Sequence, residues 1–183
     1  RGSWAGPVVA GAALLNFDDP LQKKLNDSKK LSLKTRFQIF ENLKQNIYFG
    51  IGNSSNIEID TYGIKKSTFK AMERAIADLR KKVGKFKIST LLIDGNQNPC
   101  FKNLFGTDLN LIIKGDAISP SIAAASICAK CTMDLYMSEM DAVYDGYGFG
   151  TNMGYGTKLH KNKLFISGPT QLHRMTFAPM KNM

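Results

Sequence analysis

Short apolar runs recur along the chain and predict four β-strands. Residues 6–15 (GPVVAGAALL) form a continuous, β-branched run, which is typical of a central strand covered on both faces. Residues 48–55 indicate a strand that enters a polar turn. Residues 88–96 and 109–116 are two further runs, and each ends in a glycine-containing turn. The last run has the composition of a buried strand.

Apolar residues at helical spacing predict helices between these strands. Ser32 is suited to cap a helix that reaches Ile47, and the clearest helix spans residues 64–83, with apolar positions three and four apart. Ser119 and Pro120 begin a third helix, whose small apolar first turns we expect to pack tightly against the sheet. The alternation of strands and helices indicates an α/β protein. No repeat or linker interrupts the chain, so residues 1–183 are expected to form a single domain.

The distribution of charge narrows the class of partner. The chain carries a net charge of +10, and no acidic residue follows Asp145. The basic residues and histidines of this tail are Lys158, His160, Lys161, Lys163, His173, Arg174 and Lys181. A surface of one sign suits a polyanion, and nucleic acid is favoured over a merely solubilising excess of charge.

Composition excludes several protein classes. With 43% hydrophobic and 22% charged residues, the chain has the composition of a globular domain, and no apolar run reaches membrane-spanning length. The start lacks the order of a signal peptide, so a cytoplasmic protein is expected. Three cysteines, Cys100, Cys128 and Cys131, cannot all pair, which favours reduced thiols. Cys128 and Cys131 lie in an apolar helical pattern, so we interpret them as small core residues, with a redox role as the alternative.

Two aspartates are the first candidates for chemistry. Asp94 and Asp116 are expected at the carboxyl ends of neighbouring strands, where ligands gather in α/β domains. Two carboxylates there repel each other unless a cation lies between them or one is protonated. Oxygen ligands favour magnesium or manganese over zinc, and a metal beside a nucleic-acid surface indicates phosphodiester hydrolysis. Asp and Gly are also common turn residues, so a plain turn role stays open.

An ordered series of motifs gives these residues a context. The segments are RGSWAGPVVAGAAL at 1–14, DSKKLS at 27–32, EID at 58–60, AMERAI at 71–76, IDG at 93–95, KGD at 114–116, IAAASICAK at 122–130, YGF at 147–149, GYGTKLH at 154–160 and HRMTF at 173–177. In this order the series resembles the type 2 ribonucleases H, the ribonuclease HII family, over essentially the whole chain. The large number of ordered matches makes the resemblance specific.

The resemblance implies both a fold and an activity. The fold is ribonuclease H-like, a mixed central β-sheet flanked by helices with a carboxy-terminal helical extension. Residues 1–145 would then form the catalytic core, and 146–183 a basic substrate-binding extension. The implied activity is metal-dependent cleavage of RNA in RNA–DNA hybrids and incision at single ribonucleotides in duplex DNA, which leaves 5′-phosphate and 3′-hydroxyl ends. The cofactor would be Mg²⁺ or Mn²⁺, and we expect a monomer with no membrane contact.

Specific residues follow by motif match. Asp94 and Asp116 would be two of four catalytic, metal-binding carboxylates. Arg1-Gly2 would end a GRG loop whose backbone reads the ribose 2′-hydroxyl, and Tyr155 would stack on the next deoxyribose. The other expected substrate contacts are Lys29, Lys30, Ser126, Lys130, Thr157, His160, His173 and Arg174.

Several of these positions have a plainer interpretation. Lys29 and Lys30 are as well suited to solvation as to phosphate contact. Ser126 lies one helical turn from Lys130 and could be a small packing residue. His160, His173 and Arg174 suit a cationic clamp.

Two further acidic segments have mainly structural interpretations. Asp134 is interpreted as a helix-surface residue rather than an outer-shell carboxylate. Glu58 and Asp60 are interpreted as turn-shaping residues that cap the helix after them.

The sequence departs from the family pattern at its start. The family's other two carboxylates lie in a DEAGRG motif, and this sequence begins at the RG of that motif. We expect a chain that starts at Arg1 to be inactive and poorly folded, and one extended upstream through Asp-Glu to be active. Trp4 replaces a frequent Leu beside the substrate loop, and Gly156 replaces a frequent Pro.

Two other function classes remain open from sequence. One is a nucleic-acid-binding module with this fold and no activity, which calorimetry with magnesium or manganese would separate from the enzyme. The other is a different nuclease of the same broad fold, such as a junction resolvase or integrase, which would prefer four-way junctions.

Overall fold

The computed structural model describes residues 1–16, Leu25, 32–101 and 107–183. Lys29 and Lys30 therefore lie outside the described residues. The chain divides into two compact units, each assembled from segments that are distant in sequence. The first unit comprises Arg1–Val9, Asn53–Ala71 and Thr132–Met183, and the second comprises Ala10–Gly52 and Met72–Cys131. This division does not follow the boundary expected near residue 145.

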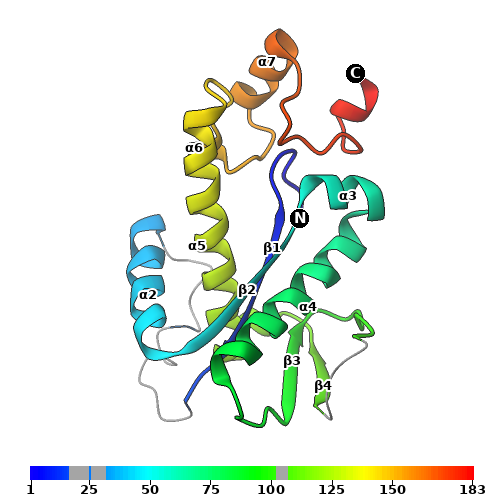
Figure 1. The fold of residues 1–183 in the computed structure, drawn as a ribbon. Coiled ribbons are helices and arrows are strands. Elements are labelled where there is room, and N and C mark those ends of the chain that lie inside the picture. The colour runs from blue at the N-terminus through cyan, green and yellow to red at the C-terminus, as the bar shows by residue number, and fades with distance from the viewer. Residues whose placement is uncertain (17–24, 26–31, 102–106) are drawn as a thin grey trace. The chain divides into compact units, whose positions relative to one another are not determined.

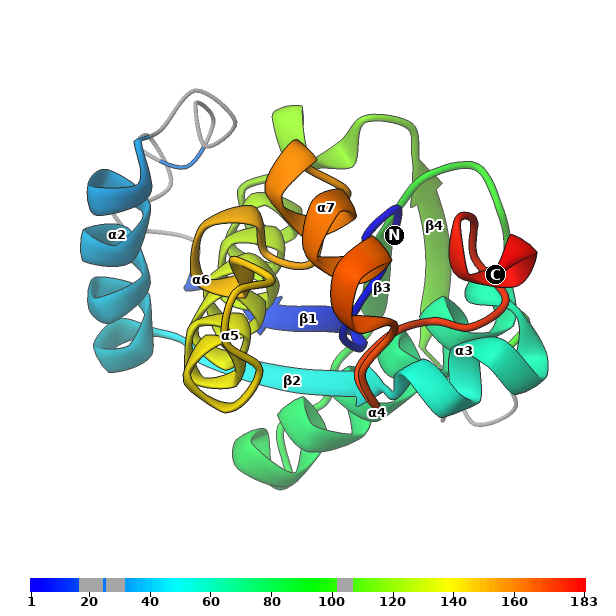
Figure 2. The same ribbon diagram turned by 90° about the horizontal axis from the view of Figure 1, so that it is seen from above.

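The four predicted strands are present, and they form two pairs. Strands β1 (Val8–Leu14) and β2 (Tyr48–Ser54) form one two-stranded sheet, and they run side by side in Figure 2. Strands β3 (Thr90–Asp94) and β4 (Asp108–Ile112) form the other, which is parallel (Figure 1). The described residues thus contain two sheets in place of one continuous central sheet.

The prediction that residues 109–116 form a buried strand was wrong. Strand β4 ends at Ile112, and Leu111 is 36% exposed. Among the described strands β4 pairs only with β3, so it is an edge strand. An edge strand has a neighbour on one side only, and its apolar composition alone does not reveal this.

The predicted helices are present at the expected positions. Helix α2 (Leu33–Asn46) starts at Ser32, whose hydroxyl accepts a hydrogen bond from the backbone N–H of Thr35 at 3.2 Å. Helix α4 spans Ile64–Val83 as predicted, and α5 (Pro120–Val143) begins at the predicted proline. The starts of α2 and α5 follow from local signals, a capping side chain at Ser32 and the fixed backbone angle of Pro120.

A short helix, α3 (Asn56–Tyr62), was not predicted. Ser55 and Glu58 form a capping box at its start, in which the Glu58 carboxylate accepts from the backbone N–H of Ser55 at 3.1 Å. Glu58 therefore caps its own helix and not the one after it, which corrects the expectation.

The core of the second unit confirms the prediction of tight helix packing. The buried residues Phe40, Leu43, Ala123, Ala124, Ile127, Cys128 and Cys131 form one apolar cluster. A Cβ atom at Gly11 of β1 would collide with the carbonyl oxygen of Ala125, so strand and helix backbones approach closely. Cys128 and Cys131 are fully buried in this cluster, and burial raises the pKa of Cys128 to about 12. Their interpretation as core residues is confirmed.

The first unit has its own core beneath the C-terminal segment. Helices α6 (Phe149–Asn152) and α7 (Lys158–Ser167) follow α5, and short 3₁₀ turns lie at Gly115–Ala117 (η2) in the second unit and Met180–Asn182 (η3) in the first. The cluster consists of Ala5, Met137, Tyr147, Phe149, Leu164, Leu172 and Met180. Within the described part of the chain, no helix combines the length and apolar character needed to cross a membrane.

Candidate active site

The parallel pair β3–β4 brings the two candidate carboxylates to one edge of the second unit. The register pairs Asp94 with Ile112, and the backbone N–H of Gly95 donates to the carbonyl of Ile112 at 2.9 Å. After β4 the chain turns through Lys114, whose φ is +55°, into η2, which carries Asp116. The backbone N–H of Gly115 donates to Asp94 Oδ1 at 2.8 Å, so the Asp94 carboxylate contacts the residue next to Asp116.

These two carboxylates have the right donor chemistry for a metal but are only part of a site. Carboxylate oxygens are the ligands that magnesium and manganese prefer. Across the described residues, no group of three or more His, Cys, Asp or Glu side chains is placed to hold a metal ion. The pair thus fits a site in which further ligands come from outside the described residues, as the expected Asp-Glu pair would.

Ser126 and Lys130 lie on the first half of α5, which follows Asp116. Ser126 is exposed, and Lys130 is partly exposed. The interpretation of Ser126 as a packing residue was therefore wrong. Both residues remain candidates for substrate contact.

In the first unit, the N-terminal segment is held against the loop that carries Tyr155. The backbone N–H of Trp4 donates to the carbonyl of Gly154 at 2.7 Å. Gly154 has a φ of +79°, and a Cβ atom added to it would collide with the carbonyl oxygen of Ala5. A Cβ atom at Gly2 would lie 4.0 Å from Cε1 of Tyr155. The Tyr155 ring is 49% exposed, so an exposed aromatic ring lies beside an exposed glycine backbone.

Two departures from the family pattern are coupled in the structure. The Trp4 indole occupies the space next to Gly156, where any Cβ atom would collide with the ring. Trp4 also lies 5.3 Å from His160, centroid to centroid. A large residue at position 4 therefore requires glycine at position 156, beside Tyr155.

His160 and His173 form a buried pair that supports the same loop. The backbone N–H of Thr170 donates to His173 Nδ1 at 2.9 Å, so this nitrogen carries no proton. The proton of neutral His173 is then on Nε2, which donates to His160 Nε2 at 2.9 Å. His160 Nδ1–H in turn donates to the carbonyl of Tyr155 at 2.9 Å. The hydrogen bond from Thr170 therefore fixes the tautomers of both neutral histidines, and the last hydrogen bond of the series holds the backbone of Tyr155.

This chain of hydrogen bonds predicts a loss of stability in acid. Burial, together with the neighbouring His160, lowers the pKa of His173 from 6.5 to about 4, and burial also lowers the pKa of His160. Between these pH values the unfolded chain binds a proton that the folded chain does not. The free energy of unfolding should therefore fall as pH drops from 6.5 towards 4, by roughly 3 kcal/mol from His173.

Urea denaturation at several pH values checks this. His173→Gln removes the titrating group while keeping a polar side chain, so its stability should depend less on pH in this window. An identical pH slope in the variant and the parent would contradict the assignment.

Arg174 is buried and binds the N-terminal segment from within. Its guanidinium donates to the carbonyl oxygens of Gly6 at 2.9 Å, Arg1 at 2.7 Å and Pro7 at 2.9 Å. Burial lowers the pKa of Arg174 to about 10, which leaves the group charged at neutral pH. Its backbone N–H also donates to the carbonyl of Trp4 at 2.8 Å. One side chain thus organises the segment that contains Arg1-Gly2.

Comparison with known proteins identifies the family to which the chain belongs. A sequence profile of the ribonuclease HII family matches residues 1–180. The chain belongs to the ribonuclease HII family. It is 42% identical over 183 residues to ribonuclease HII of Magnetococcus marinus, a match that covers 100% of this chain and 83% of that protein. Members of this family are hydrolases, so the protein is an endonucleolytic ribonuclease H.

Solved structures confirm the fold. The ribonuclease H2 of Pyrococcus horikoshii superposes with a TM-score of 0.76 at 18% identity, covering 100% of this chain and 92% of that one. Bst-RNase HIII in complex with Mn²⁺ superposes with a TM-score of 0.79 at 18% identity, covering 99% of this chain and 65% of that one. The predicted ribonuclease H-like α/β fold is confirmed.

Not every residue expected from the ribonuclease HII motifs lies where a substrate could touch it. His160, His173 and Arg174 are at most 1% exposed, so the expectation of a cationic clamp was wrong. Thr157 is exposed but caps α7, where its hydroxyl accepts from the backbone N–H of His160 at 3.4 Å. Asp134 is 1% exposed, which contradicts its interpretation as a surface residue. His160 and Arg174 instead support the backbone of Tyr155 and of Arg1.

Sequence reasoning missed Asn152, which supports the Tyr155 loop, and it assigned Asp60 to a turn, whereas Asp60 supports the C-terminal segment. Asn152 is buried, donates to the carbonyl of Tyr147 at 2.7 Å and accepts from the backbone N–H of Gly154 at 2.8 Å. Asp60 accepts from the backbone N–H groups of Met175 at 2.8 Å and Thr176 at 2.9 Å. The Asp60 contact spans more than a hundred residues, and no local pattern indicates it.

Proposed function

We propose that this ribonuclease HII is a metal-dependent endoribonuclease that cleaves the RNA strand of RNA–DNA hybrids and incises at single ribonucleotides embedded in duplex DNA. The products carry 5′-phosphate and 3′-hydroxyl ends. The observation that carries the proposal is the placement of Asp94 and Asp116 together at the carboxyl edge of β3–β4. In a member of this family, that pair would be two of the four carboxylates that form the catalytic site.

The carboxylates have one task in this proposal, which is to hold Mg²⁺ or Mn²⁺. A metal held by these carboxylates would supply activation of a water nucleophile and stabilisation of negative charge on the phosphate. A Mn²⁺ complex is known for the structural neighbour Bst-RNase HIII. The Gly115 N–H fixes the rotamer of Asp94 by binding one of its oxygens, which supports a ligand held in advance of metal binding.

The first unit supplies the groups proposed to read the sugar. The 2′-hydroxyl is the group that distinguishes RNA from DNA, and a glycine backbone at Gly2 can approach it closely. The exposed ring of Tyr155 is proposed to stack on the next deoxyribose, where it leaves little room for a hydroxyl. The +10 charge of the chain is complementary to this substrate, because the duplex backbone is a polyanion.

The test is cleavage of a duplex with one embedded ribonucleotide, beside a continuous hybrid and an all-DNA duplex, over a range of Mg²⁺ and Mn²⁺ concentrations. It uses a chain that carries the Asp-Glu pair expected upstream of Arg1. Metal-dependent incision at the ribonucleotide is expected. Metal-independent binding without cleavage would instead identify a nucleic-acid-binding relative, and preference for a four-way junction would identify another nuclease.

Tyr155→Ala should reduce incision at a single ribonucleotide more than cleavage of a continuous hybrid. The reason is that the stacked deoxyribose exists only at the RNA–DNA junction. Comparison of kcat/KM on the two substrates measures the difference. Tyr155→Phe keeps the ring and serves as the control. An equal loss on both substrates in Tyr155→Ala would indicate a purely structural tyrosine.

A further inference from the structure

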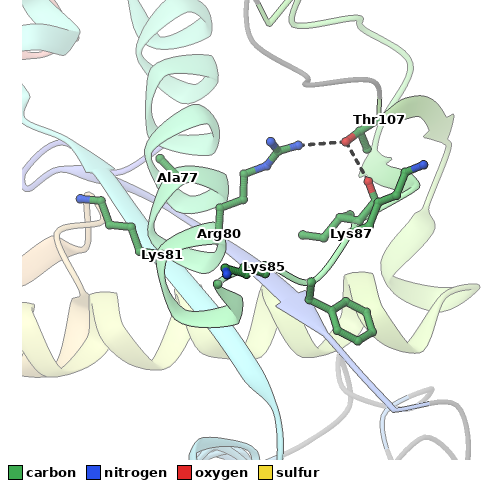
Figure 3. A pocket seen from close by; sticks show the side chains of 9 residues that line it. Ala77, Arg80, Lys81, Lys85, Lys87 and Thr107 are labelled. Carbon is green, nitrogen blue, oxygen red and sulfur yellow. Dashed lines mark hydrogen bonds between the residues drawn. The ribbon is translucent and has the colours of Figure 1, made fainter.

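The second unit contains a basic pocket that the catalytic proposal does not use. It has a volume of about 620 Å³ and lies between the last turns of α4, residues 84–88 and Thr107 (Figure 3). Four cationic residues line it, namely Arg80, Lys81, Lys85 and Lys87, and none of the acidic residues that the structure describes does. Its charge therefore suits an anionic ligand.

The pocket lies at the opposite end of the strand pair from the candidate carboxylates. Thr107 directly precedes β4, and residue 88 leads into β3, so the pocket is at the amino ends of both strands. Asp94 is at the carboxyl end of β3, four residue steps from Thr90, which corresponds to about 13 Å. A phosphate in the pocket is therefore not the phosphate cleaved at Asp94 and Asp116.

The pocket has a defined wall. Arg80 Nη2 donates to Thr107 Oγ1 at 2.9 Å, and Thr107 Oγ1 donates to the carbonyl of Ile88 at 2.9 Å, as Figure 3 shows. Thr107 is only 6% exposed. Gly84, at φ +61°, ends α4 and turns the chain. Lys85 and Lys87 therefore lie on a short loop that backbone hydrogen bonds fix at both ends, from Gly84 to Arg80 and from Asp108 to Ser89.

Helix stability explains only part of this charge. Arg80, Lys81 and Lys82 lie in the last turn of α4, where cations offset the partial negative charge of the helix end, and Lys82 also pairs with Asp78 at 2.8 Å. Lys85 and Lys87 lie beyond the helix. Both are exposed, and no carboxylate of the described residues forms an ion pair with either.

An exposed aromatic residue lies between these two lysines. Phe86 is 68% exposed, which is costly for an apolar ring without a partner. Cations that hold phosphates, with an aromatic ring between them that stacks on a base, are the pattern of sites for single-stranded nucleic acid. Double-stranded DNA offers phosphates but no free base face, and an acidic peptide offers no base.

We propose that this pocket, lined by Arg80, Lys81, Lys85, Phe86 and Lys87, binds a single-stranded nucleic-acid segment at a site separate from the catalytic carboxylates. Lys85 and Lys87 contact consecutive phosphates, and Phe86 stacks on the base between them. Binding needs neither metal nor cleavage, and the proposal goes beyond the proposed function.

The test measures binding of fluorescent oligothymidine by anisotropy, without divalent metal, at several salt concentrations. The double variant Lys85→Gln/Lys87→Gln should bind at least tenfold more weakly, and its slope of log K against log salt should decrease by about 1.4, since each single-strand phosphate contact contributes about 0.7. Phe86→Ala should weaken binding about fivefold to a hundredfold with little change in the salt slope.

The matched control is Lys65→Gln/Lys66→Gln, which removes two exposed charges from the start of α4. It should bind as the parent does. Equal weakening in both double variants, or an unchanged affinity in Phe86→Ala, would overturn the proposal. So would competition by polyglutamate as strong as that by oligonucleotide, because it would indicate charge attraction alone. Because the readout is metal-free binding, failure of the proposed cleavage activity would leave this result unaffected.

Discussion

Replacement of Asp94 or Asp116 by Asn is expected to reduce turnover by about 10³-fold or more while the protein stays folded. Removal of a metal ligand affects charge stabilisation in the transition state, where losses of about 4 kcal/mol are usual, and 1.36 kcal/mol corresponds to a factor of ten. Asn keeps the oxygen that accepts the Gly115 N–H in the Asp94 variant. The loss is therefore attributable to charge and not to the fold.

Single-turnover cleavage at saturating metal, by the chain that carries the upstream Asp-Glu pair, measures this effect, with thermal unfolding in parallel. The matched control is Asp108→Asn, an exposed carboxylate at the amino end of β4, which should cleave normally. Near-normal turnover by Asp94→Asn would show that the active site has been misplaced.

Replacement of Arg174 by Met is expected to destabilise the protein by roughly 4 kcal/mol. The variant leaves the carbonyl oxygens of Arg1, Gly6 and Pro7 without the donor that they share in the folded protein. Each buried polar group left without a partner costs about 1–3 kcal/mol, and partial access of water reduces the sum. Release of the N-terminal segment should also weaken discrimination at a single ribonucleotide, because Gly2 lies beside Tyr155.

Urea denaturation measures the stability change. Arg174→Lys should give an intermediate loss of stability. The planar guanidinium of arginine reaches all three carbonyl oxygens, whereas one ammonium group cannot. Lys158→Met removes an exposed cation of α7 and should change stability by less than about 0.5 kcal/mol. A small loss in Arg174→Met would mean that the N-terminal segment is held mainly by its backbone contacts with the Tyr155 loop.

In the basic segment after Asp145, a prediction from charge alone is misleading. His160 and His173 were interpreted as cations because they occur among lysines. In the structure each is the other's hydrogen-bond partner across thirteen residues, and both are buried. Burial penalises the charged form of a histidine, so the same residue type is a cation on a surface and a neutral hydrogen-bonding group in a core. The surrounding rings of Tyr147 and Phe149 decide this, and they come from a different segment.

The positions of the candidate carboxylates were easier to predict from the sequence. Strand ends can be predicted from short apolar runs, and parallel neighbours place such ends at one edge. Asp94 ends β3 as expected. Asp116 does not end β4, since Ile113 and the left-handed Lys114 lie between β4 and η2. Apolar content extended the predicted strand through Ile113, and the actual boundary depends on backbone pairing with β3.

The sequence by itself determined the local elements and the family. The limits of α4, the cap at Ser32 and the start at Pro120 depend on residues within a few positions of each other, so propensity and periodicity suffice to predict them. The motif series identified the family for the same reason, because each motif is a short local segment. Tertiary structure alone decided which basic residues are exposed and what the buried ones bind. Arg174 binds carbonyl groups at the opposite end of the chain, and Trp4 excludes all but glycine at position 156. Such contacts join residues far apart in sequence, and their energy depends on burial, which no local pattern specifies.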